Sequence, residues 1–540
     1  MRAFGSRTKR VWLGSSLAVA MAVGPFTDAA SADPVVERIA PRHANLDTGY
    51  LLPAGSLVLE FGSHQTAPDT GAGTGTQLYH GGIDWRGAGP FQFGVDAQVF
   101  DDPPISAIRG STENVTLLGF GANVKYQIRG DARMSVSALA GLEYFAIEPD
   151  ATAGDDWVHG AAATLKLPAS FQLSPDLHLH LVPGVTIFPD SLEGYEFFGT
   201  NAHMGAGLTW QPTPRLQAYG GVTGSFGPGG NTVTANGGID RTPVWTAGLR
   251  YAVTPRVALD AFATNGLGMS PATDLVTLFP GGDEALFGLK LTYAPGAQGS
   301  QRQAYGADPL APVTPRDRQL ARDGFTLSSA DTLSPGEARA ALGGGTDDNA
   351  ALALQFSPDH AIQLEALVED YAEDGSVGPD RNPSEDARYM FGGRLQLLDQ
   401  NNGDAVSLSA RLLAGRDIER PTTGVLFGGL SASREIGAAT AVTVNPRFAV
   451  FGDEEIGGLG LGLNHVIGRN WQLIGEITPV TGGEDAVWAA GARYALDGMP
   501  ASLDLFATNA IGRHGLGTLV AQDSTRIGLG VSFETRLFRN

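Results

Sequence analysis

Arginine and aspartate recur as matched pairs in the two halves of this sequence of 540 residues. Arg250 and Asp260 in the first half correspond to Arg493 and Asp504 in the second half, and each pair flanks a tight turn between two expected strands. On the inward face of a closed sheet, such charges would either form a rim that filters solutes or neutralise each other across neighbouring strands. We favour the cross-strand pair and keep the charged rim as the alternative.

Signals for a metal, a cofactor or catalysis are weak. His178 and His180 alternate along one strand face, a spacing that a metal could use, but no third ligand is evident. The glycine-rich stretch from Gly457 to Gly462 lies in an alternating strand without a following helix, which favours small inward-facing residues over nucleotide binding. The sequence has no G-x-S-x-G, H-E-x-x-H or P-loop motif. We therefore expect neither enzymatic activity nor a bound metal or cofactor, although a hydrolase built on one serine and one histidine would need no such motif.

The first 32 residues have the order of a secretory signal peptide. Basic residues come first, an apolar stretch follows at 11–23, and the small residues Ala30, Ser31 and Ala32 end it. The apolar stretch is short for a membrane helix, so an uncleaved anchor is the minor alternative. We expect Sec-type export and a mature chain that begins at Asp33.

Hydropathy and composition indicate strands in the exported part. Beyond residue 32 no run of about 18 apolar residues is present, so helices are not expected to cross a membrane. A closed barrel is the other structure that satisfies every backbone polar group in hydrocarbon. The 74 glycines and the charged fraction of 17% agree with this reading. The chain has no cysteine, so a large closed sheet would have to supply stability without disulfides.

The formal net charge of −21 limits the possible partners. Removing the signal peptide, whose four basic residues and Asp28 give +3, leaves about −24 on the mature chain. This charge disfavours nucleic acid as a partner and makes an anion-binding surface less expected. It would also bias a water-filled lumen toward cations if enough carboxylates face inward.

An internal duplication covers the mature chain. Residues 245–251 (WTAGLRY) match 488–494 (WAAGARY), and residues 259–265 (LDAFATN) match 503–509 (LDLFATN). Weaker matches keep the same order: 183–190 with 446–453, Gln217 with Gln472, 135–137 with 407–409, and 52–55 with 334–336. The sequence therefore divides into a first repeat at 33–295, a polar linker at 296–322 and a second repeat at 323–540.

Each repeat is expected to contain about twelve strands whose connections alternate in length. In the first repeat we expect strands near 56–64, 77–86, 91–100, 116–127, 133–145, 158–169, 177–188, 202–210, 215–225, 243–253, 256–264 and 284–294. Connections such as 87–90 and 254–255 are short, whereas those at 65–76 and 265–283 are long. The second repeat shows the same alternation and ends with a long loop at 509–523. Short periplasmic turns and long outer loops are typical of bacterial outer-membrane barrels, and we expect all long loops on the outside.

Side chains alternate along these strands. Trp245, Leu249 and Tyr251 alternate with Thr246 and Arg250, and the apolar set is expected to face lipid while the other set lines the lumen. Aromatic residues near both strand ends suggest interfacial anchors, namely Trp245, Tyr251, Trp488 and Tyr494. Phe262 and Phe506 are expected to fill the inward face, and Asn265 and Asn509 to form turns.

The final strand carries a resemblance to a known class. Ile527, Leu529, Val531 and Phe533 alternate and lead to Phe538, and this pattern resembles the C-terminal strand by which outer-membrane barrels are recognised for assembly. The usual pattern ends on the aromatic residue, whereas this chain continues with two more residues. The chain thus resembles porin-like outer-membrane β-barrel proteins of Gram-negative bacteria as an architectural class. The resemblance implies outer-membrane lipid, the barrel assembly machinery and small solutes as partners.

The expected fold is all-β, an antiparallel transmembrane barrel made as two tandem barrels of about twelve strands or one of about 24, with two slightly favoured. The leading functional hypothesis is a passive porin-like channel in the outer membrane that favours cationic or neutral small solutes. A membrane-anchored surface or scaffold protein with plugged barrels is the second hypothesis. A soluble secreted β-repeat binding protein is the third.

Overall fold

The computed structural model describes residues 34–537 except for 67–76, 102–105, 113–114, 132, 150–156, 193, 296, 298–313, 347–348, 373–386, 419–423, 452–453 and 482–484. The expected signal peptide, the start at Asp33 and Phe538 lie outside the described residues. Within the described ranges, no helix combines the length and the apolar character needed to cross a membrane.

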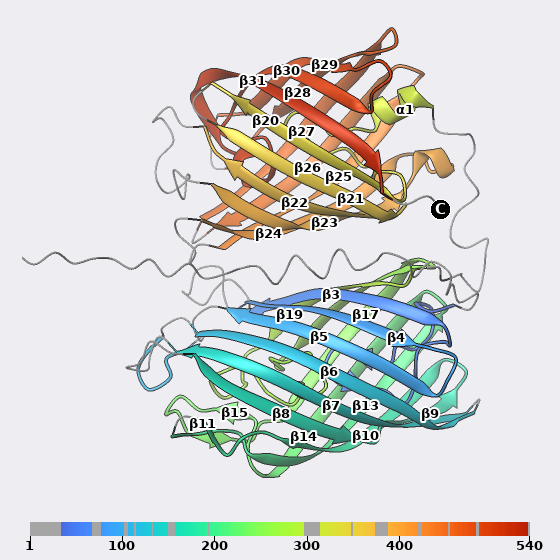
Figure 1. Ribbon diagram of the computed structural model, residues 1–540, viewed down its shortest axis with the longest axis vertical. Helices are drawn as coiled ribbons and strands as arrows, with labels where there is room; N and C mark the ends of the chain where they lie inside the picture. Colours follow the sequence, from blue (N-terminus) through green and yellow to red (C-terminus); the bar gives the residue numbers. More distant parts are fainter. Residues whose placement is uncertain are drawn as a thin grey trace, which may run out of the picture.

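The first repeat forms a closed antiparallel barrel, drawn in blue and green in Figure 1. β8 and β9 both pair with β7 and β10 and together make one interrupted strand, so the wall has twelve strands. The pairing of β10 with β13 closes the sheet. The strands are β3 (Ser56–Thr66), β4 (Gln77–Arg86), β5 (Phe91–Asp101), β6 (Val115–Gly130), β7 (Met134–Pro149), β8 (Val158–Lys166), β9 (Ala169–Ser174), β10 (Leu177–Ile187), β13 (Thr200–Thr213), β14 (Leu216–Pro228), β17 (Val244–Thr254), β18 (Val257–Thr264) and β19 (Leu286–Tyr293).

The second repeat forms a second closed barrel of twelve strands, β20 to β31. A short helix, α1 (Pro315–Leu320), precedes it and contacts β27. The strands are β20 (Glu337–Gly345), β21 (Ala350–Asp359), β22 (Ile362–Asp370), β23 (Arg388–Leu398), β24 (Ser407–Asp417), β25 (Gly424–Ile436), β26 (Thr440–Phe451), β27 (Glu454–Ile467), β28 (Trp471–Thr478), β29 (Val487–Ala495), β30 (Ala501–Ala510) and β31 (Ala521–Arg536). Two tandem barrels are therefore confirmed, and the single wall of about 24 strands was wrong.

One expected strand boundary needs correction. We expected a strand at 158–169, but after a break at Leu167 and Pro168 the chain continues as β9 to Ser174. Proline has no N–H to donate to the neighbouring strand, so the hydrogen-bond ladder is interrupted there and then resumes. The following turn to β10 is tight, as at the other short connections. Gly468, in the tight turn between β27 and β28, has a φ of 64°, which glycine adopts without steric cost.

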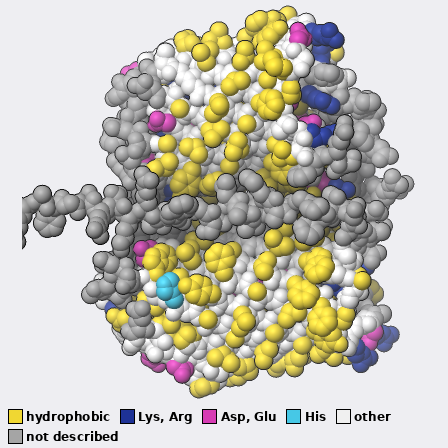
Figure 2. Space-filling view, viewed as in Figure 1, with side chains coloured by type: hydrophobic (Ala, Val, Ile, Leu, Met, Phe, Trp, Pro, Cys, Tyr) yellow, Lys and Arg dark blue, Asp and Glu magenta, His cyan; other side chains and the backbone are white. Residues whose placement is uncertain are grey.

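The apolar stripe of each strand faces outward. Trp245, Leu249 and Tyr251 on β17 are exposed, whereas Thr246 and Arg250 between them are buried. In the second barrel, Leu529 and Phe533 on β31 are exposed in the same way. Figure 2 shows hydrophobic side chains spread over the outer surface of both barrels. The outward orientation that the sequence predicted is thus confirmed, and the polar side chains line the lumens.

The outer faces of the two barrels meet beside two short turns. Val257 and Tyr293 of the first barrel and Ala361 and Ile362 of the second form one buried apolar cluster. One outward position farther along β22, Leu364 is exposed again. The barrels therefore contact each other at the ends of their strands.

Candidate functional site in the two lumens

Each lumen contains a folded segment that precedes the first strand of its barrel. We call residues 34–55 the first plug and residues 314–336 the second plug. Strands on different sides of the first barrel bind the first plug: Lys125 on β6 donates to the carbonyl of Pro41 (3.0 Å), and Gln217 on β14 donates to that of Arg38 (2.9 Å). The described part of the lumen is therefore occupied by the chain itself.

The two plugs are copies of each other. Thr48 Oγ1 donates to the carbonyl of Ala40 (2.8 Å), and Ser329 Oγ donates to that of Ala321 (2.6 Å), so the same turn closes in both plugs. The two hydroxyl residues are 281 residues apart, as are the two alanines. The duplication thus extends upstream of the 52–55 match and includes part of the stretch that we expected to be a linker.

The hydrogen bonds that anchor the plugs to the walls are also duplicated. The N–H of Leu52 donates to Gln92 Oε1 on β5 (2.8 Å), and the N–H of Leu333 donates to Gln363 Oε1 on β22 (3.0 Å). Leu52 and Leu333 are again 281 residues apart. Because β5 and β22 are each the third strand of their barrel, the plugs dock at the same place on equivalent walls.

The weak sequence match between Gln217 and Gln472 marks another anchor. Gln217 Nε2 donates to the carbonyl of Arg38 (2.9 Å), and Gln472 Nε2 donates to that of Gln319 (2.8 Å). Both glutamines are buried on the inward face of β14 or β28. Sequence reasoning found this pair as a repeat signal but could not assign its partner.

Inward glycines leave space for one leucine of each plug. A Cβ atom at Gly207 on β13 would overlap Leu46, and a Cβ atom at Gly460 on β27 would overlap Leu327. The glycine cluster at 457–462 therefore forms part of the wall surface against which the second plug packs. This finding supports small inward-facing residues rather than a phosphate-binding loop.

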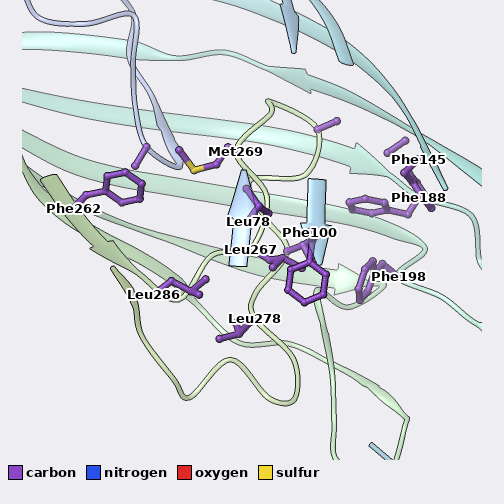
Figure 3. Close-up of a cluster of buried hydrophobic side chains, with 14 of the residues drawn as sticks. Leu78, Phe100, Phe145, Phe188, Phe198, Phe262, Leu267, Met269, Leu278 and Leu286 are labelled. Atoms are coloured by element: carbon purple, nitrogen blue, oxygen red, sulfur yellow. The ribbon is translucent and has the colours of Figure 1, made fainter. Parts of the chain in front are cut away.

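A second element enters each lumen from the end with long loops. We call residues 265–285 and 511–520 the inward loops. Leu267, Met269 and Leu278 of the first inward loop pack among wall side chains such as Leu78 and Phe100 (Figure 3). Ile511, Leu516 and Leu519 of the second inward loop are fully buried in the same way.

The expectation that all long loops lie outside was therefore wrong for these two loops. Their apolar side chains would be exposed to water outside the barrel, and burial in the lumen removes that surface from water. The alternation in length correctly separated long from short connections. It did not indicate whether a long loop extends away from the barrel or folds into the lumen.

A threonine–asparagine motif turns each inward loop into its lumen. Asn265 Oδ1 accepts from the N–H of Trp245 (2.8 Å), and Asn509 Oδ1 accepts from that of Trp488 (2.8 Å). Each asparagine also donates to a carbonyl just before β17 or β29, at 3.0 Å in both barrels. The side chain thereby continues the strand pairing while the main chain leaves the wall. The expected turn role of Asn265 and Asn509 is observed, with a precise geometry shared by both copies.

The two predicted charge pairs are buried ion pairs. Arg250 Nη1 lies 2.7 Å from Asp260 Oδ2, and Arg493 Nε lies 2.7 Å from Asp504 Oδ1. Arg513 of the second inward loop also contacts Asp504. Within each pair the two charges neutralise each other, and both side chains are shielded from solvent.

Phe262 and Phe506 fill the inward face beside the ion pairs. The ring of Phe262 lies against Gly288 and that of Phe506 against Gly528, where any Cβ atom would overlap the ring. Phe506 also stacks on Phe325 of the second plug, with ring centroids 4.7 Å apart.

The four predicted interfacial anchors lie on the outer faces of β17 and β29. Trp245 and Tyr251 are exposed, and Trp488 and Tyr494 are half-buried. The Arg215 guanidinium lies 4.8 Å from the ring centroid of Tyr251, near a short turn. Their role at a membrane interface stays a prediction.

The histidine pair on β10 bonds to hydroxyl groups. His178 Nδ1 lies 2.8 Å from the hydroxyl of Tyr50, and His180 Nδ1 lies 2.7 Å from that of Ser170. In the part of the chain that the structure describes, no group of three or more metal-ligating side chains occurs.

Each plug carries an aspartate that pairs with wall cations. Asp47 Oδ2 lies 2.9 Å from Lys166 Nζ, and Asp323 Oδ1 lies 2.9 Å from Arg394 Nη2. Burial alone would raise the pKa of both carboxyl groups. The charges of Lys166 and Arg42 outweigh burial at Asp47, and those of Arg394 and Arg411 outweigh it at Asp323, so both pKa values lie well below the ordinary range.

No protein-family model matches this chain, and no curated protein matches it. Solved barrel structures do match. The KdgM porin is 8% identical over 44% of this chain and 98% of its own, with a TM-score of 0.28. LpxR from Salmonella typhimurium is 11% identical over 44% and 99%, with a TM-score of 0.30. Outer membrane phospholipase A from Escherichia coli is 10% identical over 44% and 95%, with a TM-score of 0.26. The porin-like architecture is established by the closed strand pairing and the outward apolar stripes.

Proposed function

We propose that this protein is an outer-membrane tandem barrel whose two lumens are gated channels, each narrowed by its inward loop and closed by its own plug. The observation that carries the proposal is the chemistry of the contact between plug and wall. Plug main-chain groups bond to wall glutamine, lysine and arginine side chains, so the wall is polar beneath the plug. A polar lumen inside an apolar outer surface is what a channel through a bilayer requires.

In the proposed orientation the short turns and the plugs face the periplasm, and the remaining long loops face outward. Outer-membrane lipid covers the apolar stripes, and the barrel assembly machinery inserts the exported chain. Small solutes would cross only when a plug is displaced.

The first lumen supports the expected preference for cationic or neutral solutes. Asp84 Oδ1 on β4 accepts from Gln92 Nε2 (3.1 Å), and Asp96 Oδ2 on β5 accepts from Asn123 Nδ2 (3.0 Å). These inward carboxylates hydrogen-bond to neutral amides, so their charge is available to a solute cation once the lumen opens.

The alternative is a membrane-anchored surface protein whose plugs never leave. The filled lumens favour it, because a cavity beside the second plug has a volume of only about 50 Å³. A closed barrel could then serve as a rigid anchor for the outer loops. The soluble β-repeat hypothesis has no comparable support, since dozens of large apolar side chains face outward on both barrels.

Planar-bilayer recordings distinguish the channel from the anchor. The full chain is expected to open rarely, and a variant without residues 34–50 is expected to conduct steadily with a preference for cations over anions. Heat-modifiable migration on gels first establishes that the variant is folded. A folded variant that conducts no ions would overturn the channel proposal in favour of the anchor. Recovery of the full chain in the soluble fraction without detergent would overturn both.

A further inference from the structure

Four wall arginines hold the second plug. They are Arg394 on β23, Arg411 on β24, Arg447 on β26 and Arg493 on β29, and each is more than nine-tenths buried. They come from different sides of the wall, so their guanidinium groups converge on the plug from several directions.

The acceptors on the plug are one carboxylate, the hydroxyls of Ser328 and Ser329, and three carbonyl oxygens. Arg394 donates to the Asp323 carboxylate (3.0 Å) and to the carbonyl of Asp331 (2.8 Å). Arg493 donates to the carbonyl of Asp323 (2.9 Å). Arg411 donates to Ser328 Oγ at 3.0 Å, and Arg447 donates to the carbonyl of Thr326.

Departure of this plug would leave those donors without acceptors. Glu365 pairs with both Arg394 and Arg411, Asp504 pairs with Arg493, and Glu476 lies near Arg447. Four arginines therefore face three wall carboxylates, which leaves a net positive charge. Buried guanidinium groups that lose acceptors raise the free energy of the open state unless other oxygen acceptors replace the plug. Guanidinium groups bind carboxylates in bidentate fashion, so carboxylates are suitable replacements.

The first barrel lacks this set. In the repeat alignment, the positions of Arg394, Arg411, Arg447 and Arg493 correspond to Lys125, Leu139, Gly184 and Arg250. Two of these four positions therefore lack a cationic side chain in the first wall, where Lys166 on the intervening strand β8 pairs with both Leu139 and Gly184. The two lumens are closed in the same way but differ in the charge that each plug covers.

A route to the arginines exists beside the second plug. The cavity of about 50 Å³ is lined by side chains that include Arg318, Arg339, Arg394 and Ser329. Asp331, Glu337 and Glu534 line the same cavity, so it carries no net positive charge. It gives a small solute access to Arg394 of the four arginines.

We propose that the second lumen binds small polycarboxylate anions at Arg394, Arg411, Arg447 and Arg493, in competition with the second plug. Such an anion supplies the carboxylate and the additional oxygen acceptors that Asp323 and its neighbours supply in the closed state. The inference deepens the proposed channel function and depends on it for a displaceable plug. It assigns anionic solutes to the second lumen, in contrast to the first.

Hydrogen exchange of the full chain in detergent micelles, with citrate as the probe, tests the proposal. At constant ionic strength, replacing chloride by citrate is expected to accelerate amide exchange at 323–331 by tenfold or more. Exchange at 38–48 of the first plug is expected to stay unchanged, which provides an internal control. Unchanged exchange in both plugs, or equal acceleration in both, would overturn the proposal.

Matched variants separate anion binding from general loosening. Asp323→Asn removes the competing charge but keeps the arginines, so half-maximal acceleration is expected at a citrate concentration about tenfold lower. Asp47→Asn, which removes a buried carboxylate from the first plug, is expected to leave the citrate response of 323–331 unchanged. Arg447→Gln is expected to raise about tenfold the citrate concentration that gives half-maximal acceleration of exchange at 323–331. An unchanged half-maximal concentration would contradict an anion site that includes Arg447.

The outcome is independent of the bilayer recordings. A citrate response without ion conduction would remove the channel and leave the anion site in place. Ion conduction without a selective citrate response at 323–331 would remove the anion site and leave the channel in place.

Discussion

Arg256 in the first barrel and Asp359 in the second form an ion pair, with Nη1 2.7 Å from Oδ2. Arg256 lies in the turn between β17 and β18, and Asp359 lies at the turn between β21 and β22. Both turns are short, so the two barrels present their short-turn ends on the same side. Two barrels that cross one bilayer need this common orientation, because periplasmic turns are short in such proteins.

The common orientation predicts a selective cross-link. The natural chain has no cysteine, so Arg256→Cys and Asp359→Cys introduce the only two thiols. A short bifunctional thiol reagent is expected to join them in the folded protein, as measured by mass spectrometry of the digested chain. The control replaces Asp359→Cys with Asp240→Cys, which lies in a long connection of the first barrel. Cross-linking of the control pair but not of the test pair would contradict the common orientation.

Removal of one partner from a buried ion pair is expected to destabilise each barrel. Asp260→Asn and Asp504→Asn each leave an arginine without its charge partner in the lumen, with an expected cost of about 3 kcal/mol in the free energy of unfolding. The loss should be larger for Asp504→Asn, because that carboxylate contacts both Arg493 and Arg513. Unfolding by urea, followed by the migration of the folded and unfolded protein on gels, measures the loss of stability in both variants. The exposed pair of Arg129 and Asp131 gives a control, since Asp131→Asn should leave the midpoint unchanged.

The asparagines at the strand ends are expected to hold the inward loops. Asn265→Ala removes the acceptor for the N–H of Trp245 and the donors to two carbonyls, and an expected cost of about 2 kcal/mol follows from the unpaired groups. Hydrogen exchange in 265–285 should accelerate, and exchange in the strands should not. Asn509→Ala should have the same effect on 511–520. As a control, Asn265→Asp or Asn509→Asp keeps the oxygen acceptor and should retain part of the protection against amide exchange. Equal exchange in all variants would show that other contacts hold the loops.

A single methyl group beneath the second plug is expected to open the second barrel. Gly460→Ala places a Cβ atom against Leu327 Cδ2, so the Leu327 side chain must shift, and its packing in the lumen is disturbed. Channel openings in planar bilayers should increase. Leu327→Ala in the same chain removes the overlap and should restore closure. Gly475→Ala is the matched control, because a Cβ atom there meets open space on β28; an equal effect of both glycine substitutions would refute steric displacement.

The second plug is expected to tighten in mild acid. Burial raises the pKa of Asp331 to about 6, and the nearby carboxylate of Asp399 adds to the rise. A raised pKa means that the folded state binds the proton more tightly than the unfolded state does, so this stabilisation is lost as pH rises through about 6. After correction for intrinsic rates, exchange at 329–333 should be slower at pH 5 than at pH 7. Asp331→Asn should slow exchange at pH 7 and abolish the difference, and a persistent difference would assign the effect to another group.

The sequence predicted most of the wall. The period-two pattern placed a strand at 77–86, where β4 runs from Gln77 to Arg86. It placed the arginine–aspartate pairs on neighbouring strands, where their registers pair Arg250 with Asp260 and Arg493 with Asp504. Strand periodicity is a local property, so it can be read without knowledge of long-range contacts.

The contents of the lumens could not be predicted in the same way. Residues 34–55 show no regular period, and contacts with residues far along the chain, such as Gln92 and Gln217, fix their position. The leucines of the inward loops are a further signal that the sequence analysis did not use. Leu275 and Leu278 in a loop of an otherwise alternating sequence indicate burial, but not where the loop goes.

The matching plugs bear on the history of the gene. The same hydrogen bond joins Leu52 to Gln92 in the first barrel and Leu333 to Gln363 in the second. The ancestral unit therefore already contained a plug when it was duplicated. A filled lumen is therefore older than the double form, and the two lumens have come to differ in their arginines since the duplication.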